Sequence, residues 1–193
     1  MYKLYTFFDV ENADDELIDK CITVLPTDRK EKALRFVHKI DKNNSVISYL
    51  LMLCGTRELF GITDIELCYG NKNKPFCKNH PDIFFSISHC RKGCICAVGD
   101  NELGADIQDI KDFNLRLLPK ICTSDEERLI LSSDNKQKAF TELWTRKESF
   151  VKMKSCGISS DLKLADTIKY HNFIDSFESH GCYISVCESN RII

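Results

Sequence analysis

The succession of predicted elements indicates an α+β fold made of two similar halves, each a mostly antiparallel sheet packed with helices. Hydrophobic periodicity and turn residues give a strand, helices and further strands, and then a second set of helices followed by strands. The 193 residues, 43% of them hydrophobic and 29% charged, suffice for a substantial core. No low-complexity linker interrupts the chain. We therefore expect one half over residues 1–100 and the other over residues 101–193.

The first half is predicted to contain three helices and several short strands. Aromatic and β-branched residues at 2–10 indicate a strand, Pro26 marks the start of the second helix, and Gly61 ends the third. The turn-rich segment 70–75 is expected to be a loop. The predicted helices cover residues 14–24, 26–36 and about 45–60, and the predicted strands cover residues 2–10, 65–69, 83–88 and 94–98.

The second half begins after a turn at residues 99–101 that is typical of a hairpin, so the strand that follows is expected to pair with the strand before it. Thr123 or Ser124 is a candidate helix N-cap. Residues 139–156 lack Gly and Pro, which favours a long helix that ends at Gly157. The predicted helices cover residues 115–121, 125–131 and 140–156, and the predicted strands cover residues 103–110, 173–178 and 182–188.

The overall charge argues against a nucleic-acid or membrane partner. A net charge of −2 gives no general attraction to polyanions. The basic residues between 29 and 42 could form a nucleic-acid surface, but they lack the interleaved aromatic residues of such surfaces. The N-terminus shows no export signal, and the longest apolar stretch, 46–54, is too short to cross a bilayer. We expect a cytoplasmic protein.

The eleven cysteines do not form a recognisable zinc framework in the sequence. No Cys-x-x-Cys pair occurs, and the densest group does not have a common zinc-ligand spacing. That group consists of Cys68, Cys77, His80, Cys90, Cys94 and Cys96. An odd number of cysteines in a chain without an export signal indicates reduced thiols, many of them small core residues.

Two segments carry side chains suited to a magnesium site. On the helix at 140–156, Glu148 and Lys152 share a face with Trp144. A large aromatic residue is unusual on a solvent-exposed helix face, and charged residues are unusual on a face that packs into the core. A salt-bridged surface helix is the simpler interpretation of that helix taken alone. On the strand at 103–110, however, Asp106 and Gln108 project to one side. Carboxylates from a strand and a helix can provide the oxygen ligands that Mg²⁺ takes beside a phosphate.

Three motifs in this order resemble the Sfp-type 4′-phosphopantetheinyl transferases. They are a Ser-His pair ending a strand at 88–89, a Gly-x-Asp strand at 104–106, and the helix Trp-Thr-Arg-Lys-Glu-Ser-Phe-Val-Lys at 144–152. The resemblance extends over about residues 29–159. It implies the 4′-phosphopantetheinyl transferase fold of two pseudo-symmetric halves, with coenzyme A in the cleft between them. The implied reaction transfers 4′-phosphopantetheine to a serine of an acyl or peptidyl carrier protein and releases 3′,5′-ADP.

The resemblance also implies a role for individual residues. Asp106, Glu148 and Lys152 would be catalytic. Asp106 and Glu148 would ligate Mg²⁺, or Mn²⁺, with Gln108 as a further ligand, while Glu148 or its water would accept the serine proton and Lys152 would meet the pyrophosphate. The coenzyme A contacts would be Arg29, Lys32, Ser45, Lys74, Pro75, Ser88, His89 and Lys152. The carrier protein would dock near residues 111–123.

Two departures from the family pattern leave an alternative open. Gln108 stands where many members have a glutamate, and Asn44 stands where some relatives have an arginine. Either change lowers the charge available to the metal or the coenzyme, so a non-catalytic coenzyme A- or nucleotide-binding homologue is the alternative. Lys147 could support the site or pair with a carboxylate such as Glu126. Because both halves would come from one chain, we expect a monomer.

Overall fold

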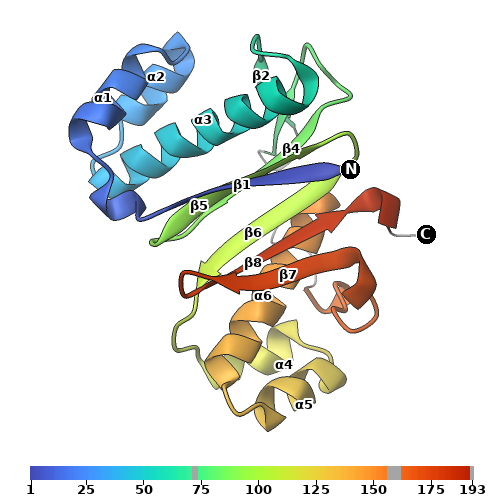
Figure 1. The fold of residues 1–193 in the computed structure, drawn as a ribbon. Coiled ribbons are helices and arrows are strands. Elements are labelled where there is room, and N and C mark those ends of the chain that lie inside the picture. The colour runs from blue at the N-terminus through green and yellow to red at the C-terminus, as the bar shows by residue number, and fades with distance from the viewer. Residues whose placement is uncertain (71–73, 156–161, 192–193) are drawn as a thin grey trace.

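The computed structural model describes residues 1–70, 74–155 and 162–191 and has an α+β fold with two three-stranded antiparallel sheets (Figure 1). One sheet has the strand order β1-β5-β4 and the other the order β6-β8-β7, while β2 and β3 form a separate pair. The strands are β1 (Tyr2–Phe8), β2 (Leu67–Tyr69), β3 (Pro75–Cys77), β4 (Phe84–His89), β5 (Gly93–Gly99), β6 (Leu103–Asp109), β7 (Ile174–Ser179) and β8 (Cys182–Glu188). The helices are α1 (Asp15–Thr23), α2 (Thr27–Leu34), α3 (Lys39–Phe60), α4 (Leu118–Ile121), α5 (Ser124–Ser132) and α6 (Lys136–Met153).

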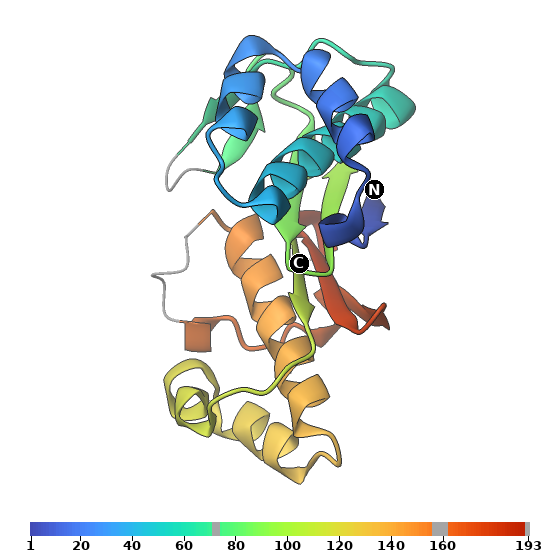
Figure 2. The same cartoon turned by 90° about the vertical axis from the view of Figure 1, so that its left-hand side faces the viewer.

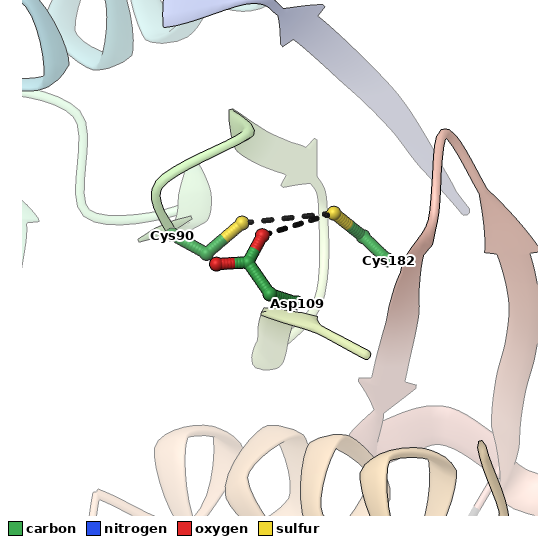
Figure 3. Close-up of side chains that lie close together, drawn as sticks. All are labelled: Cys90, Asp109 and Cys182. Carbon is green, nitrogen blue, oxygen red and sulfur yellow. Dashed lines mark hydrogen bonds between the residues drawn. The ribbon is translucent and has the colours of Figure 1, made fainter. Parts of the chain in front are cut away.

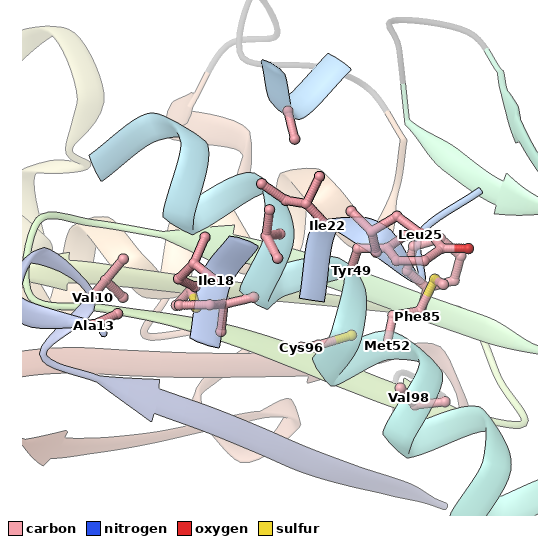
Figure 4. Close-up of a cluster of buried hydrophobic side chains, with 14 of the residues drawn as sticks. Val10, Ala13, Ile18, Ile22, Leu25, Tyr49, Met52, Phe85, Cys96 and Val98 are labelled. Atoms are coloured by element: carbon pink, nitrogen blue, oxygen red, sulfur yellow. The ribbon is translucent and has the colours of Figure 1, made fainter. Parts of the chain in front are cut away.

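The helices α1–α3 cover the sheet that contains β1, β5 and β4. Their apolar side chains meet those of β5 in one core, which includes Ile18, Met52 and Val98 (Figure 4). Gly61 adopts a φ of 70° directly after α3, so the predicted helix stop is confirmed: this left-handed conformation favours glycine. None of the described helices is long and apolar enough to cross a membrane.

The second sheet packs on α6, and α4 and α5 lie beyond it. In the turned view of Figure 2, α1–α3 lie at one end of the molecule, α4 and α5 lie at the other, and α6 runs between them. Thr123 caps α5 with a capping box: its hydroxyl accepts from the Glu126 amide, and the Glu126 carboxylate accepts from the Thr123 amide. Thr123, one of the two predicted caps, is therefore the residue used.

The predicted hairpin across residues 99–101 is wrong. β6 pairs with β8, from Leu103 opposite Glu188 to Asp109 opposite Cys182, and not with β5. The reason is that β5 lies in the centre of its sheet, where β1 and β4 already use both of its hydrogen-bonding edges. The turn therefore carries the chain from one sheet to the next. Dividing the chain into domains at residues 100 and 101 remains our proposal.

Serine side chains link the two sheets at their junction. The Ser86 hydroxyl accepts a hydrogen bond from the amide of Ala105 at 2.9 Å, and the Ser88 hydroxyl accepts one from the amide of Ile107 at 3.4 Å. Both serines lie on β4 and both amides on β6. No backbone ladder between β4 and β6 occurs in the described segments. The site residues on these strands are therefore aligned by hydroxyl groups.

Several element boundaries differ from the sequence prediction, most clearly those of β3, α3 and α6. β3 begins at Pro75, where a loop was expected, because the pair with β2 satisfies its backbone groups. α3 starts at Lys39, earlier than expected. α6 also starts earlier, since the Asn135 side chain caps it by accepting from the Lys138 amide. α6 ends at Met153, and the predicted end at Gly157 lies outside the described residues.

Gly104 sets the spacing between β6 and α6. A Cβ atom at this position would overlap the backbone carbonyl oxygen of Ser149 and the backbone amide of Met153. The glycine of the Gly-x-Asp pattern thus lets the helix approach the strand so closely that backbone meets backbone. This approach brings the carboxylate-bearing helix against the carboxylate-bearing strand.

We expect Gly104→Ala to lower the free energy of unfolding by about 1–3 kcal/mol or more, because a helix backbone cannot yield as a side chain can. Urea denaturation followed by circular dichroism measures the change. Gly70→Ala is the matched control, since its Cβ would lie 3.7 Å from its nearest neighbour, an ordinary contact. Equal stability of the two variants would contradict the close packing of α6 on β6.

Candidate active site

A cleft of about 510 Å³ lies between the layer formed by α2 and α3 and the strand–helix pair β6–α6. Nearly all the predicted site residues line this cleft, and they come from α2, α3, β3, β4, β6 and α6. Those that line it are Arg29, Lys32, Ser45, Pro75, Ser88, His89, Asp106, Gln108, Glu148 and Lys152. Lys74, the remaining one, does not line this cleft.

A compact polar cluster at the floor of the cleft contains Asp106, Ser88 and Lys152. Asp106 is only 2% exposed, and its Oδ1 accepts from the Lys152 ammonium and the Ser88 hydroxyl, each at 2.7 Å. Lys152 also donates to the Ser88 hydroxyl at 2.9 Å. The buried carboxylate is therefore paired with a cation that is itself partly open to the cleft.

Glu148 is a second buried carboxylate, and its charge is not compensated in the same way. The residue is 4% exposed, and its buried Oε1 accepts no hydrogen bond in the described part of the chain. Burial and, to a smaller extent, the charge of Asp106 raise the pKa of Glu148, while Lys152 lowers it. An unpartnered carboxylate oxygen close to a second carboxylate fits the donor set of a hard divalent cation such as Mg²⁺.

Gln108 supports Asp106 in the present arrangement. Its amide nitrogen donates to Oδ2 of Asp106 at 3.4 Å, so the amide oxygen is directed away from that carboxylate. A half-turn of the amide would exchange the two atoms and present the oxygen as a possible metal ligand. The ligand role of Gln108 remains a prediction.

The opposite wall of the cleft is basic and aromatic. Arg29 is held by hydrogen bonds from its guanidinium to the Tyr69 hydroxyl at 3.3 Å and the Ser45 carbonyl at 3.2 Å. It also lies over the ring of Tyr49, 5.0 Å from the centroid, and its Nε is buried with no partner among the described groups. Lys32 lies over the ring of Tyr69. This wall can bind an anion through prepositioned donors.

Comparison with known proteins shows which proteins this chain is similar to. A sequence model described as the 4′-phosphopantetheinyl transferase superfamily matches residues 102–183, which include the floor of the cleft. The 4′-phosphopantetheinyl transferase Sfp of Bacillus subtilis (strain 168) is 26% identical over 195 residues, 96% of this chain and 87% of the relative. The predicted resemblance to the Sfp-type 4′-phosphopantetheinyl transferases is confirmed by these similarities.

Further relatives come from bacteria and fungi. A 4′-phosphopantetheinyl transferase of Bacillus subtilis is 27% identical over 148 residues, 75% of this chain and 66% of the relative. The L-aminoadipate-semialdehyde dehydrogenase-phosphopantetheinyl transferase of Candida glabrata is 24% identical over 161 residues, 78% of this chain and 62% of the relative. Among solved structures, Thermotoga maritima holo-[acyl-carrier-protein] synthase matches 45% of this chain and 62% of its own, with 15% identity and a TM-score of 0.31.

His89 lies at the end of β4 and lines the cleft, where part of its side chain stays accessible. The surrounding protein, which removes water from the ring, lowers the pKa of His89, and the charge of Lys152 lowers it further. In its neutral form the ring can still donate one N–H to an anion. The predicted contact of His89 with the 3′-phosphate stays a prediction.

Lys74 occupies a different position from the other coenzyme A candidates of the family pattern. Its ammonium donates to the backbone carbonyls of Lys152 at 2.7 Å and Met153 at 3.3 Å, the last residues of α6. It lines an adjacent pocket of about 370 Å³ that shares Pro75 with the cleft. Lys74 therefore stabilises the end of the helix that carries Lys152, and its predicted contact with adenine stays a prediction.

The role of Lys147 is resolved by its contacts. Its ammonium lies 2.8 Å from the Glu126 carboxylate, and both side chains are fully buried. Backbone carbonyls of Leu162 and Ala165 accept its remaining hydrogen bonds. The sequence left two roles open for Lys147, support of the site or pairing with a carboxylate such as Glu126. The structure shows the ion pair with Glu126. Lys147 points away from the cleft, although it precedes Glu148 in the motif.

Sequence reasoning missed the aromatic residues Phe36, Tyr49 and Tyr69 of the cleft, and the last two lie against Arg29 and Lys32. Tyr49 could have been found, because it follows Ser45 by one helical turn and so lies on the same face of α3. Tyr69 had no comparable signal. It reaches the cleft because β2 and β3 form a two-stranded pair beside α2, and that pairing is a tertiary feature.

Proposed function

We propose that this protein transfers 4′-phosphopantetheine from coenzyme A to a serine hydroxyl of an acyl or peptidyl carrier protein in a Mg²⁺-dependent reaction, releasing 3′,5′-ADP. The similarity to 4′-phosphopantetheinyl transferases supports the proposal. One observation supports placing the reaction in this cleft: two buried carboxylates, Asp106 and Glu148, line it together with Lys152.

Asp106 and Glu148 would hold the metal ion, Mg²⁺ or in its place Mn²⁺, with Gln108 as a further ligand. The unpartnered Oε1 of Glu148 and its closeness to a second carboxylate support this assignment, because two such groups are stable together when a cation neutralises them. When bound, the ion would neutralise negative charge on the pyrophosphate as the phosphorus–oxygen bond breaks.

The remaining residues would bind and orient the two substrates. Arg29, Lys32, Ser45, Ser88 and His89 would contact the phosphates of coenzyme A, together with the Lys74-Pro75 segment near the adenine. Lys152, already paired with Asp106, would meet the pyrophosphate as a point charge. Glu148, or a water that it orients, would take the proton of the carrier serine as its oxygen forms the new bond to phosphorus.

The segment 111–123 is our proposed docking surface for the carrier protein. Phe113 and Leu117 line a pocket of about 370 Å³ next to the cleft. Trp144 lines both this pocket and the cleft. Leu115 is 55% exposed, and Arg116 and Lys120 are also exposed. An exposed apolar patch with basic residues at its edge suits a partner that is acidic and has an apolar helix face.

The proposal also includes a monomeric state and a cytoplasmic location. One chain supplies both walls of the cleft, so catalysis needs no second copy. The cysteines of the described residues are free, which fits a reducing compartment.

Intact-mass spectrometry of an apo carrier protein tests the proposal. The carrier is incubated with this protein, coenzyme A and Mg²⁺, and a mass gain of one phosphopantetheine arm is expected, which should disappear when a chelator removes the metal. Several acyl and peptidyl carriers are used. Coenzyme A binding without any mass gain would instead support the alternative, a non-catalytic coenzyme A-binding homologue.

A further inference from the structure

Three metal-ligating side chains meet outside the active-site cleft, at the end of β6 (Figure 3). Cys90 follows β4, Asp109 is the last residue of β6, and Cys182 is the first residue of β8. Asp109 is opposite Cys182 in the antiparallel ladder, so their side chains lie on the same face of the sheet. Because side chains alternate along a strand, that face is the opposite one from Asp106 and Gln108.

The distances within this cluster suit a tetrahedral ion. The sulfur atoms of Cys90 and Cys182 are 3.8 Å apart, and the sulfur of Cys182 is 3.5 Å from Oδ1 of Asp109. Each of the three residues places one ligand atom within 4.8 Å of the others. Bonds of about 2.3 Å to sulfur and about 2.0 Å to oxygen around tetrahedral Zn²⁺ require separations of about 3.8 and about 3.5 Å.

The surroundings of the cluster also favour a bound ion. Cys182 is completely buried in an apolar cluster that includes Phe8 and Cys90, while Cys90 and Asp109 keep partial exposure as a route of entry. On the neighbouring turn, the Lys92 ammonium donates to the Gly181 carbonyl at 3.2 Å. A nearby cation lowers the cost of gathering two thiolates and a carboxylate around one divalent ion.

We propose that Cys90, Asp109 and Cys182 bind one Zn²⁺ ion, with water as the fourth ligand. Binding displaces the protons of the two thiols and forms two sulfur–zinc bonds without any change in oxidation state. The ion would join the end of β4, which lies in one sheet, to β6 and β8, which pair with each other in the other sheet. Since His89 immediately precedes Cys90, and Gln108 precedes Asp109, the ion would also fix two residues of the cleft wall relative to each other.

The test uses the full chain, purified under reducing conditions and freed of metal with a chelator that is then removed. The protein is loaded with Zn²⁺ and dialysed, and its zinc content is measured by elemental mass spectrometry. Co²⁺ is titrated into a second metal-free sample, because ligation by thiolate gives a charge-transfer band that carboxylate sites lack. We expect one Zn²⁺ per chain and a Co²⁺–thiolate band. We also expect Asp106→Ala to retain that band, which separates this site from the one in the cleft.

Cys90→Ser should weaken Zn²⁺ binding more than about 10-fold, since loss of a direct ligand costs at least as much as loss of a residue that only orients one. Asp109→Asn should weaken it too, and it leaves both thiols and the core intact. Cys54→Ser is the matched control, because Cys54 is exposed on α3 and outside the cluster. Absence of zinc from the unmodified chain, or unchanged affinity in Cys90→Ser, would overturn the proposal. A Cys90–Cys182 disulfide in place of zinc in the reduced preparation would do so as well.

Discussion

Glu148→Gln should abolish phosphopantetheine transfer while leaving the fold intact. The amide is isosteric with the carboxylate but carries no charge, so it can neither help to neutralise a metal ion nor accept a proton from the carrier serine. The thermal stability of the metal-free protein should be unchanged or higher, because the substitution removes a buried negative charge that lies close to Asp106. The Oε1 atom of Glu148 also has no hydrogen-bond partner among the described groups, so no such bond is lost there.

Transfer is measured by the mass gain of a carrier protein, and stability by thermal unfolding in chelator. Glu142→Gln is the matched control, because Glu142 lies on the same helix with 38% of its side chain exposed, in a pair with Arg146. The control should retain full transfer. Turnover by Glu148→Gln at the rate of the unmodified protein would remove Glu148 from the catalytic assignment.

Lys147→Met should lower the free energy of unfolding by about 3–5 kcal/mol, the usual cost of removing one partner from a buried ion pair. The substitution fills a similar volume but leaves the Glu126 carboxylate fully buried without its cation. Three hydrogen-bond donors to Glu126, the amides of Thr123 and Thr167 and the Thr167 hydroxyl, remain and limit the loss. Urea denaturation gives the difference.

Lys136→Met makes the same chemical change on the same helix, at an exposed position, and should alter stability by less than about 0.5 kcal/mol. A similarly small effect in Lys147→Met would show that the ion pair is not a determinant of stability. The pair lies behind the cleft, so the metal-binding groups of the folded fraction should be unaffected.

Much of the fold could be predicted because local patterns and tertiary packing agree. Gly61 and Thr123 end or begin helices through backbone geometry that a few neighbouring residues determine. The wrong pairing of β6 arose from an equally good local signal, the turn at 99–101. Turn residues specify how the chain reverses direction, but they do not specify which strand has a free edge. Only the assembled sheet, with β5 at its centre, determines that.

The candidate site follows the same division between local and tertiary information. The alternation of β6 and the period of α6 indicated the faces that carry Asp106, Glu148 and Lys152, and the family resemblance grouped them; the structure brings them to one cleft. Lys74 lies beside the cleft because its ammonium is bound to the end of α6, a contact that no spacing announces. The Cys90–Asp109–Cys182 cluster was invisible in the sequence for a related reason: its members meet through strand register.

The serine-mediated junction between β4 and β6 gives the chain a natural cutting point. Side chains make the contacts across it, as between two proteins that have docked: Ser86 and Ser88 supply hydrogen bonds, and apolar side chains of both sheets share a core. Each sheet keeps its ladder on its own side. A nick at the exposed Asp100 would sever no strand pairing in either sheet. The two fragments would keep complementary faces, and the chain can be regarded as a heterodimer whose partners are joined by a short peptide tether.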